Sequence, residues 1–334
     1  MKTYNVGILG ATGAVGREML KILEERNFPV GELRLLASAR SVGKVLPFCG
    51  KEVTVVEAKD DAFEGLDIVL GAAENDIAER FAPAIRKAGA VFVDNSSAFR
   101  LCDDVPLVVP EINPEDAKKH NGIISNPNCS TIITLVALNP INKISPIKKL
   151  VASTYQAVSG AGVGGIRELE DQIAAHNSGT KAENKIFAHQ IAFNLIPAIG
   201  GTKDNGYTSE EMKLQNEGRK IMHLPDLKVT CTCVRVPVLR SHSISATFVT
   251  EDYISVEDAQ KAIEGGLGVK LVDEPQNHVY PMPLDTSDID TVYVGRIRRD
   301  LTEENGLTLF CCGDQVRKGA ATNAVQIAEL LIEK

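Results

Sequence analysis

The sequence lacks a long hydrophobic run. None of its uninterrupted apolar stretches reaches the ~20 residues that a helix needs to span a bilayer. The first residues, Met1-Lys2-Thr3-Tyr4, lead into a strand pattern and are not followed by the apolar region of a secretory signal. These two absences argue against a membrane protein and against a secreted one, so we expect a cytoplasmic protein.

Positive charge is also scarce. Lys and Arg number 36 against 44 Asp and Glu, which gives a formal net charge of −8, and the chain contains no long basic run. Such a protein offers no general surface for nucleic acid. A small anionic substrate remains possible, because a few arginines and lysines can make a locally positive pocket in an acidic protein.

Cysteines are present, but not in metal-binding pairs. The seven cysteines include no CxxC spacing, and we see no His or Cys partners at ligand spacing, so we expect no metal. Cys231 and Cys233 share one face of an expected strand, and the adjacent Cys311 and Cys312 face opposite sides of another. We interpret these four as buried, reduced thiols.

The first 130 residues alternate between strand and helix patterns. Residues 3–9 form a buried strand pattern, residues 14–26 repeat apolar positions at helical spacing, and residues 32–38 form a second strand pattern. Such alternation predicts an α/β fold with a Rossmann-type, doubly wound parallel sheet. Its further elements are strands expected at 66–72, 90–94 and 122–126 and a helix at 75–88.

The pattern changes after residue 130. Two long β-rich stretches lie at 228–250 and 291–312, and Asn305-Gly306 in the second is a hairpin signal. We predict a second, α+β domain at 131–318 with a large mixed or antiparallel sheet, for catalysis and dimerisation. The first domain, 1–130, would bind the nucleotide and carry a C-terminal helix, 319–334. The other expected elements are helices at 131–138, 163–177 and 208–222 and a strand at 148–157.

A glycine-rich loop joins the first strand to the first helix. Its GxxGxxG spacing permits a tight turn, a close approach of backbone to pyrophosphate, and close packing of helix on strand. The helix that follows would direct N–H groups and its positive dipole end at the phosphates. A merely structural glycine turn is the alternative. The expected cofactor residues in this loop are Gly10, Ala11, Thr12, Gly13, Ala14, Val15 and Gly16.

The end of the second strand bears on the choice between NAD and NADP. An NAD site usually has Asp or Glu there, bound to the ribose hydroxyl. Here the segment contains Ser38, Arg40 and Ser41 and no carboxylate. A guanidinium and two hydroxyls suit the 2′-phosphate of NADP, although Arg40 could also be a solvated loop charge.

The segment Ser125-Asn126-Pro127-Asn128-Cys129-Ser130-Thr131 contains the expected nucleophile. A strand pattern ends before it and an apolar helical pattern begins after it, so Cys129 would lie at a helix N-terminus. That position favours the thiolate and directs backbone N–H groups at a developing oxyanion. A buried structural cysteine would more often lie in the middle of an element.

A nucleophilic thiol needs a partner for its proton chemistry. The chain has six histidines, and His242 lies within the long β-rich stretch, whereas the others lie in polar or helical contexts. An isolated histidine is more often structural or solvated than catalytic, so the residues alone leave the role of His242 open.

Five segments together resemble one family. They are GATGAVG at 10–16, SNPNCST at 125–131, GAGVGGIRELE at 160–170, EEMK at 210–213 and RVPVLRSH at 235–242. In this order they are similar to the aspartate-β-semialdehyde dehydrogenases, over essentially the whole chain. The resemblance implies NADP-dependent reductive dephosphorylation of L-aspartyl 4-phosphate to L-aspartate 4-semialdehyde in the biosynthesis of lysine and diaminopimelate, methionine, threonine and isoleucine. It also implies a homodimer.

The resemblance implies a role for each matching residue. Cys129 would form the acyl thioester, His242 would be the general acid/base, and Gln156 would position the acyl group. The residue types agree with these roles. Arginine, for example, binds carboxylate and phosphate through two parallel N–H hydrogen bonds. Substrate and phosphate would be bound by Arg100, Asn128, Glu210, Lys213 and Arg235. Further cofactor positions would be Ser159, Gly160 and Gln315.

Two other functions remain to be distinguished. N-acetyl-γ-glutamyl-phosphate reductase shares the thioester strategy, but its cysteine typically follows Gly, whereas Asn128 precedes Cys129 here. Its acetylated substrate also has no ammonium group to pair with Glu210. A non-catalytic dinucleotide-binding sensor would keep the glycine loop and lose the catalytic set, but Cys129, Gln156 and His242 are all present.

Overall fold

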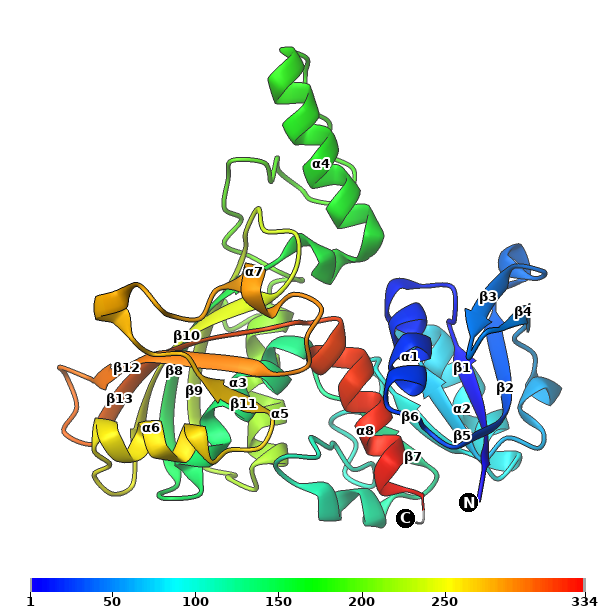
Figure 1. Ribbon diagram of the computed structural model, residues 1–334, viewed down its shortest axis with the longest axis horizontal. Helices are drawn as coiled ribbons and strands as arrows, with labels where there is room; N and C mark the ends of the chain where they lie inside the picture. Colours follow the sequence, from blue (N-terminus) through cyan, green and yellow to red (C-terminus); the bar gives the residue numbers. More distant parts are fainter. Residues whose placement is uncertain (1, 333–334) are drawn as a thin grey trace. The chain divides into compact units, whose positions relative to one another are not determined.

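A computed structural model describes residues 2–332, which form two compact units (Figure 1). The first unit contains the described residues up to Asn128 and those from Ala320 on, and the second is Cys129–Gly319. Met1 of the expected first domain and the last two residues of the expected helix 319–334 lie outside the described residues. Within residues 2–332, no helix is long and apolar enough to cross a membrane.

The first unit is built on a seven-stranded sheet with the order β3-β4-β2-β1-β5-β6-β7. Its strands are β1 (Tyr4–Leu9), β2 (Val30–Ala37), β3 (Val45–Phe48), β4 (Lys51–Glu57), β5 (Ile68–Gly71), β6 (Val91–Asp94) and β7 (Ile123–Ser125). All neighbours are parallel except β3 and β4, which form an antiparallel edge hairpin. The strand order reverses at β1, and the crevice at such a point is where doubly wound sheets bind ligands.

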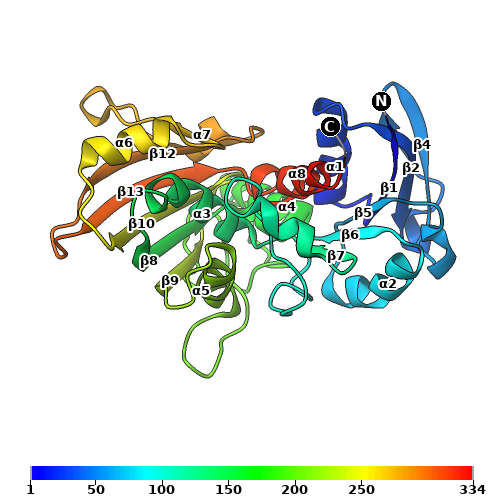
Figure 2. The same ribbon diagram turned by 90° about the horizontal axis from the view of Figure 1, so that it is seen from below.

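Helices cover both faces of this sheet. Helices α1 (Ala14–Glu25) and α8 (Thr322–Leu330) pack with one face, where Met19, Leu23 and Val325 join a buried apolar cluster. Helix α2 (Asn75–Lys87) covers the other face (Figure 2). Burial on both faces explains the nearly continuous apolar strands. The predicted α/β class with a Rossmann-type sheet is therefore confirmed.

The second unit is built on a six-stranded mixed sheet with the order β11-β12-β13-β10-β8-β9. Its strands are β8 (Ile147–Gln156), β9 (Lys228–Arg235), β10 (His242–Thr250), β11 (Val269–Leu271), β12 (Val292–Arg299) and β13 (Gly306–Gly313). The pairs β8–β9 and β11–β12 are parallel, and the other neighbours are antiparallel. The predicted second domain with a mixed sheet is confirmed.

One face of the six-stranded sheet is covered by helices. Helix α3 packs against four of the strands and against its neighbours α5 and α6. Because almost every residue of α3 is buried, its sequence is apolar on all sides rather than on one stripe. The helices of this unit are α3 (Cys129–Asn142), α4 (Gly162–Ser178), α5 (Ser209–Ile221), α6 (Val256–Glu264) and α7 (Pro283–Thr286).

Short helical turns connect the main elements. The 3-10 turns are Ala39–Ser41, Asp60–Phe63, Pro114–Lys119, Val158–Ala161 and Pro275–Asn277, and a π-helical turn spans Arg317–Ala321. The last of these shortens the expected terminal helix, because regular α8 begins only at Thr322.

Two details differ from the sequence expectations. The stretch 228–250 is two strands, β9 and β10, separated by residues 236–241. The expected hairpin between β12 and β13 is present, but Asn305-Gly306 enters β13 at the end of the connection 300–305 instead of forming a two-residue turn. A longer loop relieves both residues of the left-handed backbone that a tight turn requires.

Candidate active site

The expected site residues divide between the two units. Cys129, Gln156, Glu210, Arg235 and His242 belong to the second unit. So do Lys213, Ser159, Gly160 and Gln315, whereas the glycine loop, Ser38, Arg40, Ser41, Arg100 and Asn128 belong to the first.

Cys129 is the first residue of helix α3. It follows the short connection from β7 through Pro127, whose fixed φ is tolerated at a helix start. The thiol is half-buried and forms no disulfide with another described cysteine, and an added Cβ at Gly319 would stand 2.9 Å from the Cβ of Cys129. The first turn of a helix stabilises negative charge, so this position suits a thiolate.

The other described thiols of the second unit lie in a different setting. Cys231, Cys233, Cys311 and Cys312 are free and buried in strands, as expected. A hydrogen bond with the side chain of Cys233, followed by burial, raises the pKa of Cys231. Burial raises the pKa of Cys311 and brings that of Cys312 to about 12. Cys231, Cys311 and Cys312 therefore stay protonated and unreactive near neutral pH.

Strand register brings three site residues to one end of the six-stranded sheet. Gln156 ends β8 directly beside Arg235, which ends the parallel strand β9. His242 begins β10, which runs antiparallel to β8, so it starts at the same end. All three side chains are buried.

Arg235 is the cation of this group. Its guanidinium donates to the carbonyl of Ala157 at 2.6 Å and lies over the ring of Phe187, 5.7 Å from the centroid. Burial lowers the pKa of Arg235, while the charges of Cys129 and Glu210 act to raise it. The arginine charge thus interacts with the expected nucleophile and with a carboxylate. Arginine remains charged in such a site.

Glu210 lies in the first turn of α5, whose start is fixed by a capping box between Thr208 and Glu211. The Glu210 carboxylate accepts from Gln156 Nε2 at 3.2 Å and from Lys213 Nζ at 2.8 Å. This carboxylate therefore joins the ends of β8 and α5 and pairs with a partly exposed lysine.

His242 is fully buried and its two ring nitrogens differ. Nδ1 accepts a hydrogen bond from the backbone N–H of Ala157 at 3.1 Å. Nε2 has no hydrogen-bond partner among the described residues. Burial, reinforced by the charge of Arg235, lowers the pKa of His242 to about 3. The ring is therefore neutral near pH 7, with its proton on Nε2 because Nδ1 is an acceptor.

The backbone of Gly160 packs closely against these groups. An added Cβ there would meet Arg235 at 2.8 Å and the His242 ring at 3.2 Å. Nearby, Ser241 donates its backbone N–H to Gln315 at 2.9 Å, and Gln315 donates to Ser159. The structure thus links two of the expected cofactor residues, Ser159 and Gln315, to the residue that precedes His242.

The glycine loop of the first unit has the form of a phosphate cradle. Gly10 has φ of +87°, and a Cβ there would stand 2.5 Å from the carbonyl of Ala72. A Cβ at Gly16 would stand 2.4 Å from the carbonyl of Gly10. Helix α1 starts after Gly13, and no side chain in the described part of the chain caps it. Its first N–H groups and a close backbone approach fit a pyrophosphate.

The end of β2 adds hydroxyls and a cation. Thr12 Oγ1 donates to Ser41 Oγ at 3.4 Å, and Lys44 Nζ donates to the same oxygen at 3.3 Å. Ser38 and Arg40 lie exposed just before Ser41. Sequence reasoning missed Lys44, because it lies beyond the strand end where cofactor residues are sought. Its spacing of three from Ser41, across a turn, was the available signal.

Arg100 is largely buried within the first unit. Its Nε donates to the carbonyl of Asn126 at 3.0 Å and another nitrogen donates to the carbonyl of Asn95 at 2.6 Å. Its charge also opposes the rise that burial causes in the pKa of Asp94. Asn128 is buried too. Both residues are held at the sheet end that leads to Cys129 along the chain.

Two family models match consecutive parts of the chain. The semialdehyde dehydrogenase NAD-binding domain matches residues 5–120, and the semialdehyde dehydrogenase dimerisation domain matches residues 138–318. Aspartate-semialdehyde dehydrogenase of Aquifex aeolicus is 53% identical over 99% of this chain and 98% of that protein. The chain belongs to the aspartate-semialdehyde dehydrogenase family.

Solved structures agree with this membership. A crystal structure of aspartate semialdehyde dehydrogenase II of Vibrio cholerae, complexed with ASA, is 46% identical, with a TM-score of 0.97 over 99% of this chain and 98% of that one. A structure of aspartate semialdehyde dehydrogenase with NADP from Candida albicans is 26% identical, with a TM-score of 0.78 over 99% and 98%. The family resemblance seen in the sequence motifs is confirmed.

Proposed function

We propose that the chain is an NADP-dependent aspartate-semialdehyde dehydrogenase that converts L-aspartyl 4-phosphate to L-aspartate 4-semialdehyde and phosphate through a thioester on Cys129. The observation that carries this proposal is the convergence of buried Gln156, Arg235 and His242 at one end of the six-stranded sheet, where Gln156 also donates to Glu210. A thiol at a helix start, a cation, a carboxylate and a neutral imidazole together match a zwitterionic acyl substrate.

The thiolate of Cys129 begins the reaction. The start of helix α3 and the charge of Arg235 stabilise it. Its sulfur attacks the acyl carbon of the substrate, the bond from that carbon to the phosphate oxygen breaks, and phosphate leaves. We assign Arg100, Asn128 and Lys213 to the phosphate, because cationic and amide N–H groups stabilise a departing oxyanion.

The amino-acid end of the substrate needs one cation and one anion. We assign its carboxylate to the guanidinium of Arg235 and its ammonium to Glu210. We assign Gln156 to orienting the acyl group from its place at the end of β8. Its amide also donates a hydrogen bond to Glu210. This complement favours a substrate with a free ammonium group over an acetylated one.

His242 acts as a donor through Nε2 in this proposal. The Ala157 N–H occupies Nδ1, so the neutral ring carries its proton on the nitrogen that has no partner among residues 2–332. That N–H stabilises the oxyanion that forms when the thiolate adds to the carbonyl. The low pKa of His242, about 3, keeps the ring neutral throughout. A role for Nε2–H as hydrogen-bond donor to the oxyanion is therefore favoured over removal of the thiol proton by this ring.

The cofactor proposal assigns the pyrophosphate to residues 10–16 and the 2′-phosphate to the end of β2. Arg40, Ser38, Ser41 and the additional Lys44 supply cationic and hydroxyl donors for that phosphate. Glu57 lies opposite Ala37 in the sheet, and its carboxylate pairs with Lys59 at 2.8 Å. When bound, NADPH supplies the hydride that converts the thioester to the aldehyde. We assign Ser159, Gly160 and Gln315 to the same cofactor.

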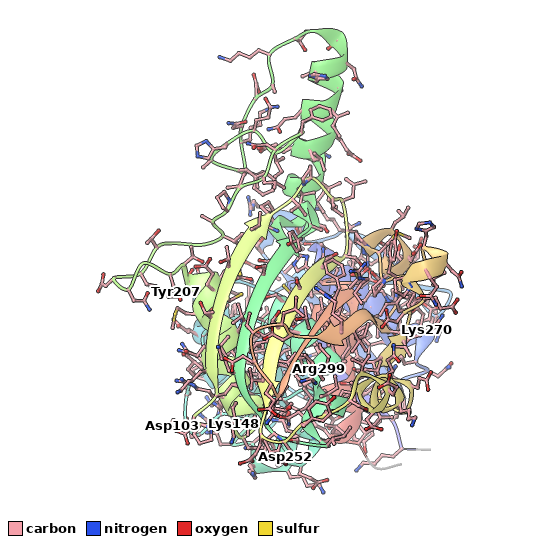
Figure 3. All side chains as sticks on the ribbon, turned by 90° about the vertical axis from the view of Figure 1, so that its left-hand side faces the viewer. Asp103, Lys148, Tyr207, Asp252, Lys270 and Arg299 are labelled. Atoms are coloured by element: carbon pink, nitrogen blue, oxygen red, sulfur yellow. The ribbon has the colours of Figure 1, made fainter. Side chains whose placement is uncertain are left out.

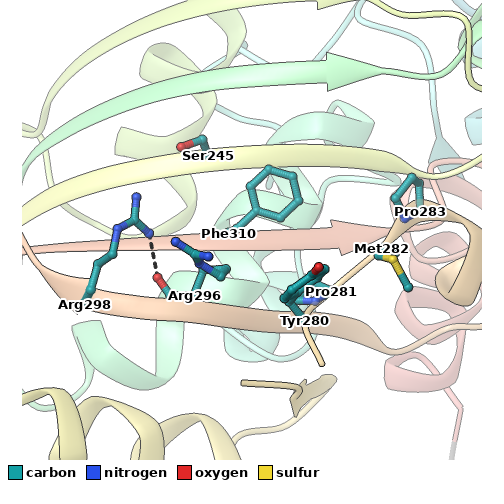
Figure 4. A pocket seen from close by; sticks show the side chains of 8 residues that line it. All are labelled: Ser245, Tyr280, Pro281, Met282, Pro283, Arg296, Arg298 and Phe310. Carbon is teal, nitrogen blue, oxygen red and sulfur yellow. Dashed lines mark hydrogen bonds between the residues drawn. The ribbon is translucent and has the colours of Figure 1, made fainter. Parts of the chain in front are cut away.

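The open face of the six-stranded sheet is the proposed homodimer surface. Val151 and Tyr155 of β8 are exposed there, and Phe310 of β13 stacks near Tyr155 with ring centroids 6.3 Å apart. A pocket of about 440 Å³ on this face is lined by Ser245, Tyr280, Pro281, Met282, Pro283, Arg296, Arg298 and Phe310 (Figure 4). Exposed apolar side chains rimmed by arginines are typical of an interface core.

A pair of matched valines tests the dimer. Val151 and Val56 are each 40% exposed, and Val56 lies in the first unit. We expect Val151→Glu to shift sedimentation from dimer to monomer and Val56→Glu to leave it unchanged. Equal sedimentation of both variants as dimers would contradict the assigned surface. A thiolate nucleophile at Cys129 also suits a reducing compartment, which supports a cytoplasmic location.

A substrate panel tests the activity. The purified protein is assayed for phosphate-dependent reduction of NADP with L-aspartate 4-semialdehyde, with N-acetyl-glutamate 5-semialdehyde and NAD in parallel lanes. We expect turnover of the first substrate, with NADP preferred. Turnover of the acetylated substrate alone would instead assign the protein as an N-acetyl-γ-glutamyl-phosphate reductase. NADP binding without any turnover would indicate a sensor.

A further inference from the structure

A neighbouring segment packs against the glycine-rich start of helix α4. A Cβ at Gly164 would stand 2.9 Å from the side chain of Ile186, and one at Gly165 would stand 3.2 Å from the ring of Phe187. The chain after α4 returns alongside this helix (Figure 1). The two glycines, part of the motif at 160–170, therefore leave room for residues 186 and 187.

Two buried polar side chains of α4 hold the same segment. The carboxylate of Glu168, only 5% exposed, accepts from the backbone N–H groups of Lys185 at 2.8 Å, of Ile186, and of Phe187 at 3.3 Å. It also accepts from Gln172 Nε2 at 3.2 Å. Backbone groups outside regular structure need such partners when buried. A charged acceptor makes the stronger bonds.

Gln172 extends this attachment along the segment. Its side-chain oxygen accepts from the backbone N–H groups of Ile191 at 2.9 Å and Ala192 at 3.0 Å. Its nitrogen also donates to the carbonyl of Glu183 at 3.0 Å. A small apolar cluster of Val158, Leu169, Ile191 and Ala192 lies beneath these bonds. Glu168 and Gln172 thus fix residues 183–192 onto α4.

The fixed segment and the residues that follow it contact Arg235 in two places. Phe187 lies under the guanidinium, and the backbone of Ile196 pairs with that of Arg235 through bonds of 2.9 and 3.0 Å. The Ala157 carbonyl holds one guanidinium nitrogen. With its backbone paired, one face covered and one nitrogen bound, the planar fork of Arg235 has a fixed direction.

We propose that Glu168 and Gln172 are positioning residues for substrate binding, which hold Phe187 against the guanidinium of Arg235. This inference rests on the proposed function, in which Arg235 binds the substrate carboxylate. A ring on one face of a partly desolvated arginine both stabilises it and limits its rotation. A preorganised arginine loses less freedom when it binds its ligand.

Kinetics of three variants test the inference. Phe187→Leu and Glu168→Ala should raise the KM for L-aspartate 4-semialdehyde by about 5- to 20-fold, the range expected for loss of a cation–π contact. The kcat and the KM values for phosphate and NADP should stay close to wild type. Phe187→Tyr keeps an aromatic ring and should restore the wild-type KM. A purely structural role would lower the unfolding temperature without this selective change in KM.

Three further variants complete the design. Phe193 lies on the same segment, is 66% exposed and stacks on His176 rather than on Arg235, so Phe193→Leu should leave every constant unchanged. In an Arg235→Lys background, Phe187→Leu should cause little further increase in the KM for L-aspartate 4-semialdehyde. An unchanged KM in Arg235→Lys itself would overturn the role of Arg235 and hence the proposed function. A raised KM there, with an unchanged KM in Phe187→Leu, would overturn only the positioning inference.

Discussion

The two ends of the six-stranded sheet carry similar residue types in opposite environments. At one end, Gln156, Arg235 and His242 are buried at the ends of their strands. At the other end, Lys148 pairs with Glu251 at 3.1 Å, and the two side chains are 58% and 52% exposed. Figure 3 shows Lys148, Asp252 and Arg299 together at this second end.

This difference shows how to separate functional charges from solvated ones on a single scaffold. Exposed ion pairs are screened by water and contribute little to stability. Buried charges carry a desolvation cost that must be offset by specific partners. Arg235 and His242 carry that cost, and both have shifted pKa values. Such shifted groups concentrate at functional sites.

Removing the nucleophile should separate the two ends most clearly. Cys129→Ala should lower kcat by about 10⁴-fold or more, because no described group replaces a covalent nucleophile. NADP binding, measured by fluorescence titration, should be retained. Cys102→Ala, at an exposed cysteine, is the matched control and should have wild-type kinetics. Substantial turnover by the Cys129→Ala protein would rule out the thioester route.

The buried imidazole should have the next largest effect. His242→Gln should lower kcat by about 10²- to 10⁴-fold, as expected for loss of a positioned proton donor. His278 is an exposed histidine of the same unit, so His278→Gln should be neutral. Equal, small effects of both substitutions on steady-state kinetics would contradict the donor role of His242.

Arg235, which we assign to the substrate carboxylate, should act mainly on substrate affinity. Arg235→Lys keeps the charge but loses the two-pronged grip, and the KM for L-aspartate 4-semialdehyde should rise by about 10- to 100-fold, as for a lost charge-assisted hydrogen bond. The KM for NADP should remain near wild type. A KM increase confined to NADP would place Arg235 at the cofactor instead.

Acid should reveal the burial of His242 through stability. The pKa of His242 is about 3 in the folded chain, below the 6.5 of an exposed histidine. The unfolded state therefore binds more protons between these values, so this group destabilises the fold as pH falls from 6.5 toward 3. The free energy of unfolding, measured with denaturant, should fall more steeply as the pH is lowered in the wild type than in His242→Gln. If the free energies of unfolding of the two proteins fell in parallel with pH, the ring of His242 would not be buried in its neutral form.

The exposed end should give the smallest effect. Lys148→Ala removes a half-exposed ion pair with Glu251, so kcat and KM should stay within about 2-fold and stability should change little. Steady-state assays and thermal unfolding check both statements. A large kinetic effect here would remove the contrast between the two ends.

Much of the fold was predictable because its signals are local. The glycine loop, the strand before it and the helix after it each follow from period and turn chemistry, and β1 and α1 lie close to the expected ranges. The place of Cys129 at a helix start was predicted in the same way, from a strand pattern before it and an apolar helical pattern after it. The hairpin β3–β4 was missed, since its strands carry exposed positions and lie at a sheet edge.

The surroundings of the site were less predictable because they depend on distant contacts. The Ala157 N–H that fixes His242 is separated from it by 85 residues. Phe187 lies in a segment without regular structure, so no periodicity marks it. Lys44 approaches Ser41 only through the turn before the β3–β4 hairpin. Backbone donors and loop side chains leave no pattern in the sequence that identifies their partners.

Capture of the acyl enzyme tests the central claim most directly. The protein is mixed with L-aspartate 4-semialdehyde and NADP without phosphate, quenched in acid, digested and analysed by mass spectrometry. The thioester mechanism predicts a stoichiometric burst of NADPH and an aspartyl thioester on the peptide that contains Cys129, which disappears when phosphate is added. A burst with the acyl group on another residue, or turnover with no acyl enzyme, would contradict it.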